Sequence, residues 1–226
     1  TILDLGSGPG TCSKELAKIV GTGGKIISVD KSSHYIQYIE DNIQNKYPQI
    51  IPICTSFEDL NLEPNSIDHM FCRWSLAWVQ NPNKIIRKIK SFLKKGGKMV
   101  FHEYYDWSTH QIFPFKENID KCIKAALKSF KESDFEIDIG AALPQILYDM
   151  DFNIISTRLM PKLAKPNSRE WNWPKTFYYN YFPRLVKMGY LNNNDTKEFF
   201  EDFKSLEILP YSRIFCPILI EIIAEK

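Results

Sequence analysis

Residues 1–11, T-I-L-D-L-G-S-G-P-G-T, carry the clearest fold signal in the sequence. Its first five residues predict a short buried strand, which runs directly into a turn with glycines at alternate positions, Gly6, Gly8 and Gly10. Glycine readily adopts left-handed backbone conformations and lets the chain approach a ligand closely. A helix is predicted at Cys12–Val20, so its free N–H groups would face the same crevice. We therefore expect a ligand-binding turn here.

Strands and helices alternate downstream of this turn. The further predicted strands are Lys25–Asp30, Ile50–Thr55, Ile67–Cys72, Lys98–Tyr104, Phe152–Met160 and Ser212–Ala224. The further predicted helices run from Ser32 or Ser33 to about Tyr47 and over Pro82–Leu93, Phe115–Lys131 and Ile139–Met150, with Pro144 placed in the first turn of the last one. This alternation predicts βαβ units and an α/β fold with a parallel sheet covered on both faces.

The acidic residues beside the turn indicate which ligand it binds. Asp30 ends the second predicted strand, where a carboxylate can accept hydrogen bonds from both ribose hydroxyls of a nucleoside. The dinucleotide fingerprint G-x-G-x-x-G does not fit, because Thr11 occupies its third glycine position. Asp4 lies two places before the first glycine, where a carboxylate suits a cationic ligand better than a diphosphate.

The pattern D-x-G-x-G-x-G, formed by Asp4, Gly6, Gly8 and Gly10, resembles the first motif of class I S-adenosylmethionine-dependent methyltransferases. The resemblance implies a doubly wound, mostly parallel seven-stranded sheet, the Rossmann-like methyltransferase fold, in a single domain over residues 1–226. It also implies S-adenosylmethionine as the cofactor. The cofactor-binding residues that it implies are Asp4, Gly6, Ser7, Gly8, Gly10, Asp30, Lys31, Ser56, Phe57, Glu58, Cys72, Arg73 and Trp74.

The resemblance covers residues 1–105, the expected cofactor-binding half. Two irregular, aromatic-rich regions follow, 106–136 and 161–210, in the positions where this family carries helical insertions that cover the acceptor. A small-molecule pocket is mostly apolar with a few polar groups, which these regions could supply. The alternative is a helical hairpin that packs on the sheet for stability alone.

Candidates for a catalytic base lie at the end of the fifth predicted strand and just after it. Strand alternation places His102 and Tyr104 on one face and Glu103 on the other. We predict Glu103 and His110 as the catalytic residues, which a hydroxyl acceptor would need and a carboxylate acceptor would not. We also expect that no single substitution among these candidates abolishes cofactor binding.

Composition narrows the class of acceptor. The 29 basic and 27 acidic residues leave a formal net charge of +2, which offers no global field for nucleic acid or a membrane.

The 5 cysteines are odd in number and form no C-x-x-C pair, which argues against a disulfide framework or a metal site and favours the cytoplasm. The chain does not begin with Met, so we expect a preceding segment.

The sequence therefore predicts a methyltransferase that acts on a small, hydrophobic or aromatic metabolite, with an oxygen or carbon acceptor favoured. The motifs typical of nucleic-acid amino-methyltransferases do not occur after the fourth predicted strand, which continues as Cys72-Arg73-Trp74-Ser75. Two alternatives stay open, a non-catalytic S-adenosylmethionine-binding module and an NAD-type oxidoreductase. The identity of the acceptor and the oligomeric state are also open.

Overall fold

The computed structural model describes all residues from Thr1 to Lys226, and these divide into two compact units. Unit 1 comprises Thr1–Glu103, Ile139–Arg158 and Ile220–Lys226, and unit 2 comprises Tyr104–Asp138 and Leu159–Leu219. Both predicted insertions, 106–136 and 161–210, fall within unit 2.

The large sheet has seven strands in the order β3-β2-β1-β4-β5-β10-β7. Its strands are β1 (Ile2–Leu5), β2 (Ile26–Asp30), β3 (Ile50–Cys54), β4 (Ile67–Arg73), β5 (Leu93–Asp106), β7 (Asn153–Met160) and β10 (Ile218–Glu225). The pairs from β3 to β5 are parallel. Gly96, near the start of β5, donates its N–H to the carbonyl of Lys226 beyond the end of β10, so these two strands run antiparallel. The predicted seven-stranded, mostly parallel sheet is confirmed.

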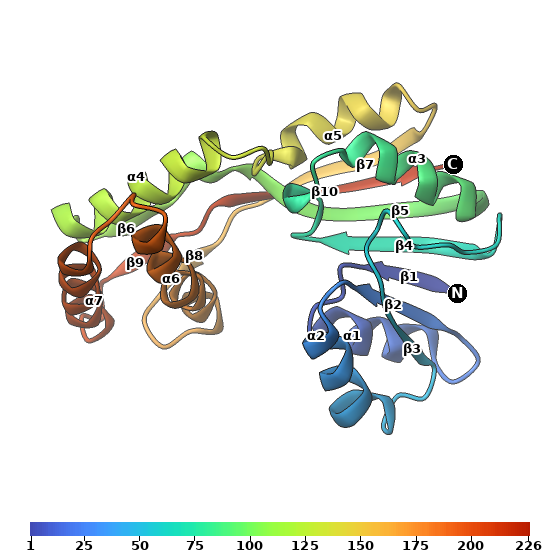
Figure 1. The fold of residues 1–226 in the computed structure, drawn as a ribbon, viewed down its shortest axis with the longest axis horizontal. Coiled ribbons are helices and arrows are strands. Elements are labelled where there is room, and N and C mark those ends of the chain that lie inside the picture. The colour runs from blue at the N-terminus through green and yellow to red at the C-terminus, as the bar shows by residue number, and fades with distance from the viewer. The chain divides into compact units, whose positions relative to one another are not determined.

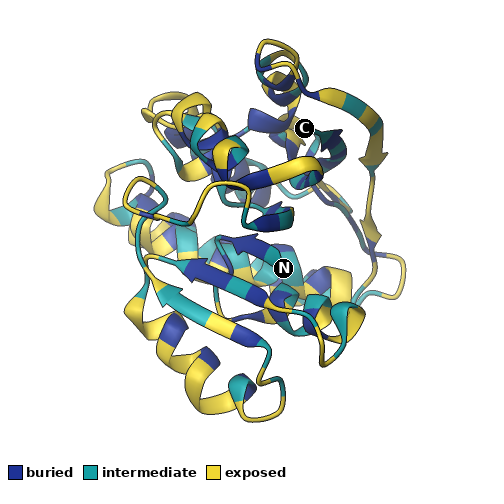
Figure 2. Ribbon diagram, turned by 90° about the vertical axis from the view of Figure 1, so that its right-hand side faces the viewer, coloured by how far each residue is buried: buried dark blue, intermediate teal, exposed yellow.

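The helices of unit 1 bury one face against this sheet, and Figure 2 shows them alternating between buried and exposed residues. They are α1 (Thr11–Val20), α2 (Ser33–Ile39), α3 (Pro82–Phe92) and α5 (Ile139–Tyr148), all labelled in Figure 1. The π-helical turn η1 (Glu40–Gln44) and the 3-10 turn η2 (Leu76–Trp78) belong to the same unit. In the core beside β2 and β3, Ala17 of α1 meets Ile36 and Ile39 of α2. Ser32 caps α2 and Asn81 caps α3, each accepting a backbone N–H.

Unit 2 consists of helices and a small sheet. The helices are α4 (Glu117–Lys131), α6 (Arg169–Lys187) and α7 (Asn193–Glu207), and η3 (Trp107–Thr109) is a 3-10 turn. A three-stranded sheet has the order β6-β9-β8, formed by β6 (Gln111–Phe113), β9 (Arg213–Phe215) and β8 (Leu163–Ala164). None of the helices in either unit is both long enough and apolar enough to cross a membrane.

Several predicted elements differ from the structure. The predicted helix up to Tyr47 is α2 followed by η1, so the α-helix itself ends at Ile39. The strand predicted from Lys98 starts already at Leu93, because Gly96 and Gly97 continue the pairing rather than forming a separate turn. Pro144 lies in the interior of α5 and not in its first turn. The run predicted as one closing strand is split between β9 and β10.

Candidate functional site

The glycine-rich turn lies at the carboxyl end of β1, which pairs with β2 on one side and with β4 on the other. All three glycines have left-handed backbone angles, with φ of 78° at Gly6, 51° at Gly8 and 77° at Gly10. A side chain could not replace Gly6, because its Cβ would lie 2.0 Å from the hydroxyl oxygen of Ser75. Gly8 faces open space, with no atom within 4 Å of the position that a Cβ would take. The turn therefore packs tightly at its first glycine and presents bare backbone at its second.

Asp30 is tied directly to this turn. One carboxylate oxygen accepts the N–H of Gly8 at 2.9 Å, and the other accepts the N–H of Ser32 at 2.9 Å. Each carboxylate oxygen can accept a further hydrogen bond, so the group can still receive hydroxyl donors. The predicted association of Asp30 with the glycine-rich turn is thus present in the folded chain.

Asp4 is buried beneath the turn and belongs to a short chain of hydroxyl groups. Ser13 of α1 donates to its carboxylate at 2.5 Å, and Ser28 of β2 donates to the Ser13 hydroxyl at 2.8 Å. Burial raises the pKa of Asp4 to about 6, against the lowering effects of the Ser13 hydrogen bond and of the Arg73 charge. Sequence reasoning missed Ser13 and Ser28, whose only local signal is a serine on the buried face of an element.

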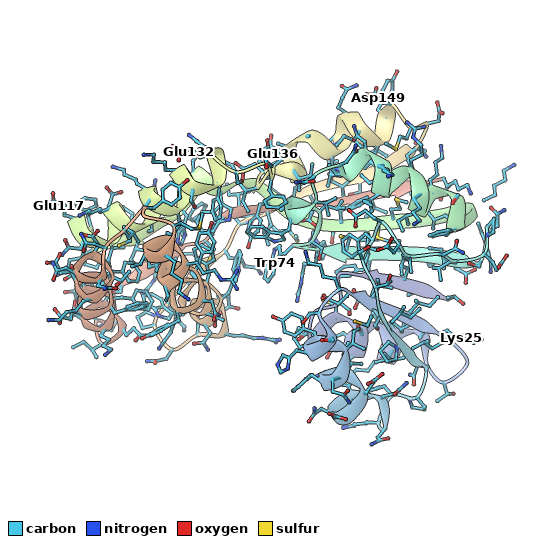
Figure 3. The ribbon with its side chains drawn as sticks, in the orientation of Figure 1. Lys25, Trp74, Glu117, Glu132, Glu136 and Asp149 are labelled. Atoms are coloured by element: carbon cyan, nitrogen blue, oxygen red, sulfur yellow. The ribbon has the colours of Figure 1, made fainter.

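The segment after β4 packs against the glycine-rich turn. Trp74, labelled in Figure 3, has a left-handed φ of 55°, and the Arg73 guanidinium lies 4.7 Å from its ring centroid. The Ser75 hydroxyl lies 3.0 Å from the carbonyl of Arg73 and 3.4 Å from that of Gly6. Ser75, which was not predicted, is thus the residue that joins the β4 turn to the glycine-rich turn.

The other residues predicted to bind the cofactor differ in whether they contact the glycine-rich turn. The Phe57 ring comes within 3.3 Å of the Cβ position of Gly6, so it belongs to the same wall. Ser56 donates to Asp59 instead of facing the turn, at 2.7 Å. Lys31 and Glu58 are exposed, and their carbonyls accept hydrogen bonds from Cys54 and Lys88. Their roles in cofactor binding stay predictions.

The two residues predicted as catalytic have different environments. Glu103, near the end of β5, is fully buried, and burial raises its pKa to about 7, despite hydrogen bonds from Ser75, Leu76 and Cys72. His110 lies in unit 2, where one ring nitrogen faces the Phe215 carbonyl and the other faces the Tyr178 hydroxyl. Burial lowers the pKa of His110 to about 4. Their predicted catalytic roles are untested.

The crevice residues fit a nucleoside-containing cation such as S-adenosylmethionine. The Ser7 hydroxyl is buried at the turn and has no hydrogen-bond partner in the chain, which a ligand would supply. Helix α1 begins without a side-chain cap, so its first N–H groups are not satisfied by a side chain. Two acids adjoin this turn, since Asp4 lies two residues before Gly6 and Asp30 accepts the N–H of Gly8, the middle glycine. The arrangement is that of the Rossmann-like methyltransferases.

Comparison with known proteins defines the family. Residues 1–139 match the methyltransferase domain family, and the chain belongs to that family of S-adenosylmethionine-dependent enzymes. It is 24% identical over 228 residues to the phosphoethanolamine N-methyltransferase of Triticum aestivum, covering 95% of this chain and 40% of that protein. It is 26% identical over 126 residues to the ubiquinone/menaquinone biosynthesis C-methyltransferase UbiE of Hydrogenovibrio crunogenus, covering 50% of each.

A solved structure has the same fold. The Haemonchus contortus phosphoethanolamine N-methyltransferase 2, in complex with phosphomonomethylethanolamine and S-adenosylhomocysteine, superimposes with a TM-score of 0.59 at 17% identity. The match covers 100% of this chain and 48% of that one. The chain thus spans half or less of the length of these relatives.

Proposed function

We propose that this protein transfers the methyl group of S-adenosylmethionine to a small-molecule acceptor. The observation that carries the proposal is the D-x-G-x-G-x-G turn, with Gly8 hydrogen-bonded to Asp30 and the unpartnered Ser7 hydroxyl beside it. The sulfonium supplies an already activated methyl group, so the chain mainly has to bind and orient the two reactants. Asp30 would hold the ribose hydroxyls, and Asp4 would favour the cationic end.

We further propose an oxygen or carbon acceptor on a hydrophobic or aromatic metabolite. Support comes from the aromatic side chains of unit 2, where Trp107 packs against Tyr104 and Phe177. Relatives carry the names of N- and C-methyltransferases, so the family alone leaves the acceptor atom open. The near-neutral net charge of +2 favours a small molecule over nucleic acid.

Calorimetric titration with S-adenosylmethionine, S-adenosylhomocysteine and NAD tests the cofactor. We expect binding of the first two only, and a loss of at least tenfold in affinity in Asp30→Ala, because its carboxylate accepts the Gly8 N–H and would hold the ribose hydroxyls. Asp41→Ala, which changes an exposed acid on η1, is the matched control and should bind normally. Binding of NAD, or of none of the three, would overturn the proposal and favour an oxidoreductase or a different kind of module.

A further inference from the structure

The side chain of Glu103 makes an unusual set of contacts for a carboxylate. One oxygen, Oε1, accepts the N–H of Ser75 at 3.0 Å and that of Leu76 at 3.1 Å, and the Cys72 thiol lies 3.5 Å away. The other oxygen, Oε2, is buried and has no hydrogen-bond partner. No lysine or arginine forms an ion pair with Glu103. The chain therefore uses this carboxylate as an acceptor for backbone N–H groups.

The segment that Glu103 holds needs such an external contact. Trp74 adopts a left-handed backbone conformation that L-residues disfavour, so the turn after β4 is not stabilised by local preference. The N–H of Trp74 is bound by the carbonyl of His102, the neighbour of Glu103 on β5. Two successive residues of β5 thus fix three successive N–H groups of this turn, those of Trp74, Ser75 and Leu76.

The Trp74–Leu76 segment, which His102 and Glu103 bind, also contacts the glycine-rich turn. The Ser75 hydroxyl lies 3.4 Å from the Gly6 carbonyl, and the space beside Gly6 is filled by Ser75 itself. A shift of the Ser75 backbone would therefore change the packing of Ser75 against Gly6. Because Glu103 is 0% exposed, it cannot touch a ligand in this conformation, whereas the turn that it holds packs against the glycine-rich turn.

We infer that Glu103 is a positioning residue, which holds the Trp74–Leu76 turn against Gly6 and thereby sets the affinity for the cofactor. The inference rests on the proposed function, since it concerns the same crevice. It assigns Glu103 a role other than removing a proton from the acceptor. An ionised carboxylate is a stronger acceptor than a protonated one, so the hold should weaken as the pH falls through about 7.

The effect of Glu103 on the pH dependence of affinity has to be distinguished from the effects of other titratable groups near it. On β4, the Cys72 thiol stays neutral, because burial and the Glu103 charge raise its pKa well above the usual range. On β1, Asp4 has a pKa of about 6, and the Arg73 charge acts on it. On β10, Glu221 is bonded to His102 at 2.8 Å, next along β5 from Glu103. A pH dependence that belongs to Glu103 must therefore vanish when Glu103 alone is made neutral.

The test is titration of S-adenosylhomocysteine into the wild type, Glu103→Gln and Glu103→Ala between pH 6 and 8.5, with Glu63→Gln as an exposed-acid control. We expect wild-type affinity to fall at least threefold from pH 8.5 to 6. Glu103→Gln, whose amide oxygen can still accept both N–H groups, should lose that part of the pH dependence and stay within threefold of the wild type at pH 6. Glu103→Ala should bind at least tenfold more weakly at every pH.

The outcomes separate this inference from the proposed function. If the wild type fails to bind S-adenosylhomocysteine, the proposed function fails. If the wild type binds and both Glu103 variants match its affinity and pH profile, the positioning role is refuted. If Glu103→Ala does not fold, Glu103→Gln decides: an unchanged pH profile in that variant overturns the inference, and the loss of its neutral-pH step supports it.

Discussion

Substitution of Gly6 by alanine tests how the glycine-rich turn is packed. Its φ of 78° is left-handed, which costs an L-residue about 1–2 kcal/mol. The new Cβ would also lie 2.0 Å from the Ser75 Oγ and 2.5 Å from its Cβ, and such overpacking typically costs about 1–3 kcal/mol. Ser75 cannot move freely, because its N–H is bound by Glu103. We expect Gly6→Ala to lower the free energy of unfolding by roughly 2–5 kcal/mol.

Gly8→Ala is the matched control for this prediction. Gly8 is also left-handed, with φ of 51°, but has no atom within 4 Å of its Cβ position. Only the conformational cost of about 1–2 kcal/mol should apply, although the added methyl group would occupy the open space at the crevice. Gly8→Ala should therefore reduce the free energy of S-adenosylhomocysteine binding by more than it reduces the free energy of unfolding.

Urea denaturation of the wild type, both alanine variants, Ser75→Gly and the double variant Gly6→Ala/Ser75→Gly measures the steric part directly. Removing the Ser75 side chain should relieve the clash, so the cycle should show a favourable coupling of about 1–3 kcal/mol. Equal stability of Gly6→Ala and Gly8→Ala, or a coupling near zero, would refute the reasoning that Ser75 is pinned against Gly6.

Three further predictions concern buried titratable groups. Because burial raises the pKa of Asp4 to about 6 from 3.8, its contribution to stability is full below about pH 4 and is lost as the pH rises through 6. Asp4→Asn should therefore gain up to about 3 kcal/mol over the wild type at pH 7.5 and nothing at pH 4, by urea denaturation. Tyr178→Phe removes the donor to His110 and should cost about 1–3 kcal/mol in thermal unfolding, without changing S-adenosylhomocysteine affinity. The His110 ring should also show no NMR titration between pH 5.5 and 8, since burial lowers its pKa to about 4.

The predictions for Asp4 and His110 each have a result that would contradict them. An Asp4→Asn variant with the same pH dependence of stability as the wild type would show that Asp4 does not titrate near 6. A His110 ring that titrates near its ordinary value of 6.5 would mean that the nitrogens are not both engaged in the interior. Such a result would favour His110 as the catalytic base.

Local sequence signals predicted unit 1 well because its elements are continuous and periodic. The apolar run before Gly6, the helix after Gly10 and the acid at Asp30 each carry a signal within a few residues. The small sheet of unit 2 was not predicted, because its three strands have two or three residues each. Such strands are stabilised by pairing between distant segments, as where Ile112 faces Ile214, and no short window contains that information.

In the candidate site too, local motifs were predicted and contacts between distant segments were not. Asp4, Gly6, Gly8 and Asp30 form one motif that spacing reveals, and the structure brings them together. Ser75 acts through contacts with Gly6 and Glu103, both far away in sequence. Its residue type gives no warning of this role, because a serine after a strand is ordinary loop chemistry. The sequence also gives no sign of the positive φ of Trp74, the residue just before the two N–H groups that Glu103 accepts.

Packing explains much of the aromatic density of unit 2. Tyr178, Phe182 and Phe199 are each 0% exposed and meet one another edge to face or at a tilt, with centroids 4.6–5.2 Å apart. These rings form a core between α6 and α7. An apolar acceptor would have to be met by rings outside that core, such as half-buried Trp173, which stacks on Tyr104. Stability and acceptor recognition would then depend on different aromatic residues, so substitutions in the two groups should affect different measurements.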